Sequence, residues 1–199
     1  SVHDTGAGFV AATGVVQASA RLRLGFATGS SDGLAGRLDL AVQQDAPLLA
    51  ARRAGLSQAA ATRDGRALGL ALQQGRWTLG AIATSESVDH GRGLRDGRLT
   101  QVSVAAARSF GPLRLSAQAA LAEERKGMFG GSSNGLLAVA SASHRLLGLE
   151  AAADLGAGWR VSGQWTGGWT RITPGAGLLA GIDGLTSSGW RMATGKTGL

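Results

Sequence analysis

Apolar side chains recur at every second position in many short stretches of this chain. Leu68, Leu70 and Leu72 alternate with alanine and glycine, and Trp159 and Val161 alternate with polar residues. Successive side chains of a β-strand point to opposite faces, so a period of two predicts strands with one apolar face. About ten such stretches, most of about ten residues, are typical of a transmembrane β-barrel. The pattern therefore predicts an all-β fold, an antiparallel up-and-down transmembrane barrel.

Turn residues divide this pattern into ten expected strands. Asp-Gly pairs favour tight hairpins, because both central positions of such a turn can take positive φ. These pairs begin at Asp32, Asp64, Asp96 and Asp183. The expected strands cover residues 20–29, 36–44, 66–74, 76–87, 98–109, 112–123, 135–144, 146–156, 158–171 and 187–194.

The connections between these strands alternate between short and long. The short ones are residues 74–75, 111–112 and 156–158, and the long, polar ones are residues 86–97, 123–134 and 173–187. An outer-membrane barrel has short periplasmic turns at one end and long loops at the other, so this order supports the barrel prediction.

One stretch, residues 45–62, does not fit the alternation. It is rich in alanine, and Pro47 would be acceptable in the first turn of a helix. We expect a helical or irregular loop there, within a single barrel domain that covers residues 1–199.

The composition favours lipid over a soluble core as the environment of the apolar face. Aromatic residues make up 5% of the chain, tyrosine is absent and there are 33 glycines, so a densely filled interior would be hard to build. The longest apolar run, residues 136–142, is far below the roughly 20 residues of a membrane helix. Cysteine is absent, which excludes a disulfide framework.

The formal net charge of +7 is spread singly along the chain and not clustered on one element. We therefore expect no nucleic acid partner, and a basic barrel rim that meets anionic lipid headgroups instead. The first six residues lack the basic start and apolar core of a signal peptide. In an exported protein, this sequence would be an internal portion of the mature chain.

The alternation also assigns side chains to the two faces of the barrel. Residues expected to face lipid are Leu68, Leu70, Leu72, Leu113, Leu115, Leu147, Leu149, Trp159, Val161 and Trp165. Residues expected to line a wet lumen are Arg21, Arg23, Arg37, Asp39, Arg114, Gln118 and Gln164. The five tryptophans are candidates for anchors at the headgroup level, with ordinary strand packing as the alternative: Trp77, Trp159, Trp165, Trp169 and Trp190.

Three short motifs suggest chemistry, but each lacks its structural context. Residues 131–135 match the G-x-S-x-G elbow of hydrolases around Ser133, yet a loop precedes them and a strand candidate follows, where a helix is needed. Asp4-Thr5-Gly6 matches the triplet of aspartic proteases without the second copy that the reaction requires. Gly195-Lys196-Thr197 resembles the end of a phosphate loop, but position 190 holds tryptophan.

The three histidines are His3, His90 and His144, and their spacing suggests no metal site. We accordingly expect no cofactor, no metal and no enzymatic activity in this chain.

The C-terminal half resembles a known family. Residues 158–163, 165–171, 181–191 and 193–199 are similar to the C-terminal barrel region of subtilisin-like serine protease autotransporters of alphaproteobacteria. The likeness is clearest over residues 110–199.

This resemblance implies a translocator. In such proteins a barrel in the outer membrane supports export of a protease passenger in the same chain. Implied partners are outer-membrane lipid and lipopolysaccharide, the barrel assembly machinery and the passenger. The protease's own motifs are absent, so no catalytic residue carries over. Barrels of this kind end on a strand with a terminal aromatic, so we expect closing strands after Leu199.

Two other functions remain open on the sequence alone. The first is a soluble or surface-exposed antiparallel β domain that binds a partner through its glycine-rich loops. The second is a hydrolase that uses Ser133. Extraction separates the first from a barrel, which needs detergent, and loss of activity in Ser133→Ala would identify the second.

Overall fold

The computed structural model describes seven segments of the chain. These are residues 3–5, 9–29, 62–88, 97–128, 131–132, 139–174 and 181–196. The expected strand at 36–44 and most of the expected loop at 45–62 lie outside these residues.

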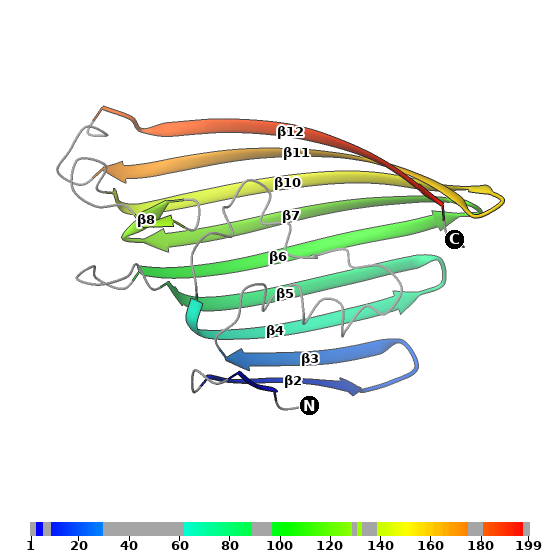
Figure 1. Ribbon diagram of the computed structural model, residues 1–199, viewed down its shortest axis with the longest axis horizontal. Helices are drawn as coiled ribbons and strands as arrows, with labels where there is room; N and C mark the ends of the chain where they lie inside the picture. The colour runs from blue at the N-terminus through cyan, green and yellow to red at the C-terminus, as the bar shows by residue number, and fades with distance from the viewer. Residues whose placement is uncertain are drawn as a thin grey trace.

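The described residues form one layer of antiparallel strands that follow one another in chain order (Figure 1). Ten strands belong to this sheet, in the order β1-β2-β3-β4-β5-β6-β7-β10-β11-β12, and β8 and β9 form a separate two-stranded sheet. The up-and-down antiparallel fold is therefore as the alternation predicts. The strands are β1 (His3–Thr5), β2 (Phe9–Gln17), β3 (Leu22–Gly29), β4 (Thr62–Gln74), β5 (Trp77–Val88), β6 (Gly97–Phe110), β7 (Leu113–Arg125), β8 (Gly127–Met128), β9 (Gly131–Ser132), β10 (Val139–Gly156), β11 (Trp159–Pro174) and β12 (Gly184–Lys196).

The division of residues 135–156 into two strands is wrong, because β10 is one continuous strand of 18 residues. Arg145 does not interrupt it. Its register partners are Leu121 on β7 and Trp169 on β11, so pairing continues unbroken on both sides. β10 extends past its leucines, so it can continue through a charged residue that lies on the same face as these leucines.

Two strands near the N-terminus, β1 and β2, were not expected from the alternation. The pair β8 and β9 likewise lies in the stretch expected to be a loop, residues 123–134, and β7 extends to Arg125. The other described strands differ from their predicted boundaries by a few residues.

The tight turns lie at glycines, but not at Asp-Gly pairs. Gly75 and Gly111 each have φ of +61° at the first turn position, which a side chain would disfavour. Asp64 and its following glycine lie inside β4, and the glycines after Asp96 and Asp183 each begin a strand. The prediction of tight turns at these three pairs is therefore wrong, and the pair at Asp32 lies outside the described residues.

From β2 to β12, short and long connections are sorted to opposite ends of the sheet (Figure 1). The connections 18–21, 75–76, 111–112 and 157–158 join strands at one end, and 30–61, 89–96, 126–138 and 175–183 join them at the other. Within the described residues the sheet is open, with β1 and β12 at its two edges.

The buried residues on one face of the sheet are mostly small, whereas large apolar residues are exposed on the other. Buried clusters such as Ala27 with Ala67 and Ala71 contain little volume. Leu68, by contrast, is 67% exposed. A few large apolar side chains are buried, such as Leu99 with Leu146. The exposed ones form no core, and their exposure favours an apolar environment outside the protein.

Candidate functional site

Strand pairing places the expected lipid-facing residues on one face of the sheet, here called the outward face. Leu68 on β4 is the register partner of Phe26 on β3 and of Ala83 on β5, and the same row continues through Val102 to Leu121. Alternation from this row puts all ten of those residues on the outward face. They are Leu68, Leu70, Leu72, Leu113, Leu115, Leu147, Leu149, Trp159, Val161 and Trp165.

The expected lumen residues divide into three groups. Arg23, Arg114, Gln118 and Gln164 lie on the opposite face, called the inward face. Arg21 precedes β3, and its carbonyl accepts a hydrogen bond from the Gln73 backbone N–H at 2.8 Å. Arg37 and Asp39 lie outside the described residues. That the outward face contacts lipid and the inward face lines a lumen stays a prediction.

The outward face carries an apolar band, which is clearest on β7 and β10. On β7 the outward residues from Leu113 to Leu121 are all leucine or alanine, and on β10 the same holds from Leu147 to Leu155. Eight residue steps span about 27 Å along a strand. Tilted by the usual 35–45°, this length gives a band of about 20 Å, close to the height of the apolar band in outer-membrane barrels.

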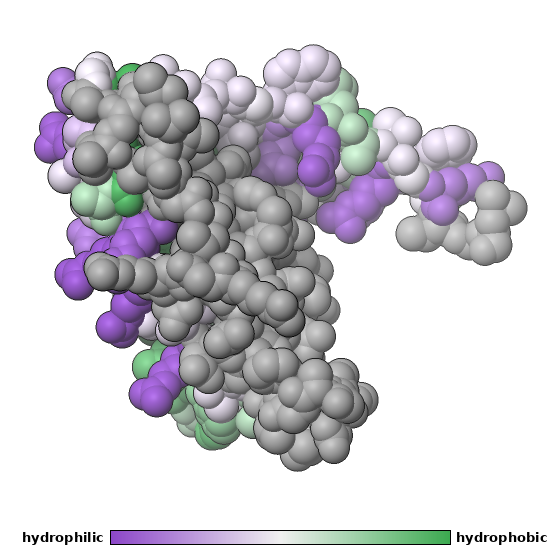
Figure 2. Space-filling view, turned by 60° about the vertical axis from the view of Figure 1, so that its left-hand side comes forward, coloured by the Kyte–Doolittle hydropathy of each residue, from purple (hydrophilic) through white to green (hydrophobic). Residues whose placement is uncertain are grey.

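Beyond this band, at the end with long connections, the outward face becomes charged, with five arginines and the exposed carboxylate of Glu123. Arg66, Arg98, Arg125, Arg145 and Arg171 lie there in phase with the leucines of their own strands. Figure 2 turns this end toward the viewer, and hydrophilic residues stand beside hydrophobic ones along its left margin. A charged rim at the end of an apolar band is what a strand leaving a bilayer requires.

Aromatic residues mark the opposite end of the band, near the short turns. The guanidinium of Arg108 lies 5.1 Å from the ring centroid of Trp77 and 4.7 Å from that of Phe110. The Lys196 ammonium lies 5.7 Å from the ring of Trp159. Amphipathic rings with a cation beside them are typical of the headgroup level of a membrane.

All five tryptophans belong to the outward face, where each is at least 41% exposed. Strand packing against a protein core would bury these rings. Trp77 and Trp159 lie near the short turns and Trp169 lies beside Arg145, which favours the anchor interpretation for these three, whereas Trp165 and Trp190 lie in the row of Leu149, in the middle of the apolar band. The residues are Trp77, Trp159, Trp165, Trp169 and Trp190.

The inward face carries a buried polar cluster that sequence reasoning did not find. His144 on β10 is fully buried, and its Nδ1 lies 2.8 Å from the hydroxyl of its register partner Thr170. Its Nε2 lies 3.8 Å from a carboxylate oxygen of Glu124 on β7. Pairing across β7, β10 and β11 brings these residues together, and their separation in sequence gave no signal of it.

The described residues offer no metal constellation. Among them, no three His, Asp or Glu side chains gather closely enough to hold a metal ion. Lys196 lies in β12 and not in a phosphate loop. Ser133 and His90 lie outside the described residues. Nor does this part of the chain contain a helix long and apolar enough to span a membrane.

Comparison with solved structures finds outer-membrane proteins. A loop L8 deletion mutant of OmpT, an outer membrane protein of Vibrio cholerae, matches 92% of this chain and 53% of its own, with a TM-score of 0.53 and 10% identity. A refined porin structure matches 94% of this chain and 55% of its own, with a TM-score of 0.46 and 15% identity. This chain spans about half the length of both structures.

No family model matches the sequence, and no curated protein matches it. The likeness to OmpT shows that the fold is that of an outer-membrane β-barrel protein. This fold is consistent with the bacterial outer membrane, the location expected from the alternation and from the order of the connections.

Proposed function

We propose that this chain forms an outer-membrane β-barrel that acts as the translocator of an autotransporter. The observation that carries the membrane part is the separation of the two faces. One face holds the apolar band between an aromatic edge and a basic edge, and the other holds mostly polar and small residues with a few buried leucine and isoleucine side chains. The translocator part depends on the resemblance of residues 110–199 to autotransporter barrels.

In this role the chain acts as a membrane-embedded structure and carries out no chemical step. Outward leucine, valine and tryptophan side chains hold the sheet in lipid, while inward residues such as Arg114, Gln118 and Gln164 keep the other side wet. The proposed partners are outer-membrane lipid and lipopolysaccharide, the barrel assembly machinery and a passenger domain of the same chain. The proposal includes no nucleic acid, no cofactor and no catalytic step in the barrel.

The membrane part is tested by folding with and without detergent. We expect a β-type circular dichroism spectrum only in micelles, with a folded band that shifts on boiling in gel electrophoresis. A cooperative β fold in plain buffer would contradict the proposal and favour a soluble or surface-exposed β domain that binds a partner.

The translocator part needs a separate experiment. A signal peptide and a small reporter are placed before Ser1, and cells of a Gram-negative host are treated with external protease. We expect cleavage of the reporter in intact cells. A barrel that assembles in the outer membrane while its reporter stays protected would retain the membrane role and reject the export role.

A further inference from the structure

Two hollows lie on the outward face, one near its basic end and one in the middle of the apolar band. The first has a volume of about 390 Å³ and lies across β10, β11 and β12. We call it the arginine hollow. Most of its lining residues belong to the outward face by register, namely Ser143, Arg145, Trp169, Arg171, Gly184 and Thr186.

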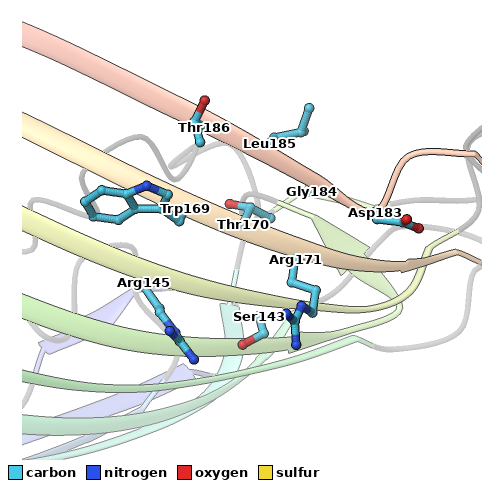
Figure 3. Close-up of a pocket in the computed structure, with 9 residues that line it drawn as sticks. All are labelled: Ser143, Arg145, Trp169, Thr170, Arg171, Asp183, Gly184, Leu185 and Thr186. Carbon is cyan, nitrogen blue, oxygen red and sulfur yellow. The ribbon is translucent and has the colours of Figure 1, made fainter.

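The arginine hollow has the chemistry of a phosphate site. Figure 3 shows the side chains of Arg145 and Arg171 extending to the same side from neighbouring strands, with Ser143 between them. Neither guanidinium forms an ion pair with any residue that the structure describes. Asp183 also lines the hollow, but it lies apart from both arginines (Figure 3). Guanidinium groups bind phosphate oxygens in a bidentate manner, which makes arginine the preferred partner of phosphate esters.

The second hollow, here the alanine groove, has a volume of about 400 Å³ and is almost wholly apolar. Its floor contains Ala106, Ala117 and Ala119, three small residues of the outward face on β6 and β7. Larger side chains stand beside this floor, including Leu147 and Leu149. An apolar depression lined by alanine and leucine side chains suits a segment of a hydrocarbon chain.

The two hollows follow each other along one strand. Arg145 lines the arginine hollow, and the next two outward residues of β10, Leu147 and Leu149, line the alanine groove. Four residue steps place the ends of this series about 13 Å apart. A ligand that fits both hollows therefore has an anionic head and an apolar chain, in the orientation of a lipid in a bilayer.

We infer that these hollows bind one phosphorylated glycolipid of the outer leaflet, of the lipid A type. A headgroup phosphate contacts Arg145 and Arg171, and an acyl chain lies in the alanine groove. The inference rests on the proposed membrane location. It selects the outer leaflet because the arginine hollow lies at the end with long connections, which is the external end of such barrels. Trp169 at this level fits the usual place of tryptophan among headgroups.

The phosphate contact is tested with diphosphorylated lipid A and the full chain folded in detergent micelles, with bound lipid measured by native mass spectrometry. We expect the double variant Arg145→Gln with Arg171→Gln to bind about tenfold more weakly or worse, because charge-assisted hydrogen bonds are lost. The matched control is Arg66→Gln, which removes the first charge beyond the apolar band on β4, outside both hollows. It should bind within about twofold of the unmodified chain.

The acyl contact is tested by filling the groove. Ala119→Phe places a ring on the floor, whereas Ala81→Phe places the same ring in the same register row on β5, outside the groove. We expect only Ala119→Phe to weaken lipid A binding. Dephosphorylated lipid A is a second ligand that tests the phosphate contact. Its binding to the unmodified chain should be about as weak as the binding of lipid A to the double variant.

Each outcome gives a decision. If lipid A binds the double variant as tightly as it binds Arg66→Gln, the proposed site is wrong. The site is also wrong if the unmodified chain binds dephosphorylated lipid A as tightly as lipid A. Either result leaves the membrane barrel intact, provided that the heat-modifiable folded band is present. Absence of that band in micelles contradicts the proposed membrane role and this site together.

Discussion

The two faces of β7 differ in chemistry although they alternate along the same 13 residues. Leu113, Leu115 and Leu121 point outward and remain exposed, whereas Arg114 and Gln118 point inward and are half-buried. In a water-soluble sheet the leucines would be the buried set. This inverted distribution favours the prediction that the outward face contacts an apolar surrounding and that the inward face lines a polar space.

The largest test of this comparison is a charge placed in the apolar band. Leu70→Arg should lose about 2–4 kcal/mol of folding free energy in a bilayer, because the guanidinium must be transferred into hydrocarbon. We expect little or no assembled barrel, measured as the heat-modifiable fraction in outer membranes. Arg114→Leu on the inward face should assemble nearly normally. Equal sensitivity at the two sites would contradict the assignment of the faces.

A smaller effect is expected at the buried polar cluster of the inward face. Thr170→Val removes the hydroxyl that lies 2.8 Å from the Nδ1 of His144, and should lower the free energy of unfolding by about 1–3 kcal/mol. Urea unfolding in micelles gives this value. Thr173→Val, an exposed outward residue of the same strand, should change it by much less. Similar losses would mean that the cluster does not stabilise the sheet.

The smallest effect is expected at the aromatic edge of the outward face. Phe110→Leu keeps an apolar side chain but removes one of the two rings beside Arg108, at a cost of about 0.5–1 kcal/mol. Ser109→Ala changes the neighbouring inward residue and should be neutral. The midpoint of urea unfolding in micelles separates the two. A larger loss of stability in Ser109→Ala than in Phe110→Leu would contradict the assignment of the stabilising contact to the outward face.

Much of the fold could be predicted because a period of two is a local signal. Leu68, Leu70 and Leu72 indicate both a strand and a face without knowledge of any neighbour. The errors also have local causes. The expected strands 135–144 and 146–156 left Arg145 between them, although it lies in phase with the leucines of β10. A turn was predicted at Asp64 because Asp-Gly pairs favour tight hairpins, but this pair lies inside β4, next to a register shift.

The candidate sites were less accessible to sequence reasoning. His144, Thr170 and Glu124 are scattered over three strands, and Arg145 and Arg171 are 26 residues apart. One signal could have found the arginines, since each is in phase with the outward residues of its own strand. No sequence signal places them beside each other.

The sequence by itself determined the chemistry of each face, because alternation depends only on the geometry of a single strand. Tertiary structure decided which residues meet across strands, because register is set by pairing and a shift of one residue would reverse every face. The arginine hollow, the alanine groove and the buried histidine all result from pairing. They belong to the sheet and not to any one of its strands.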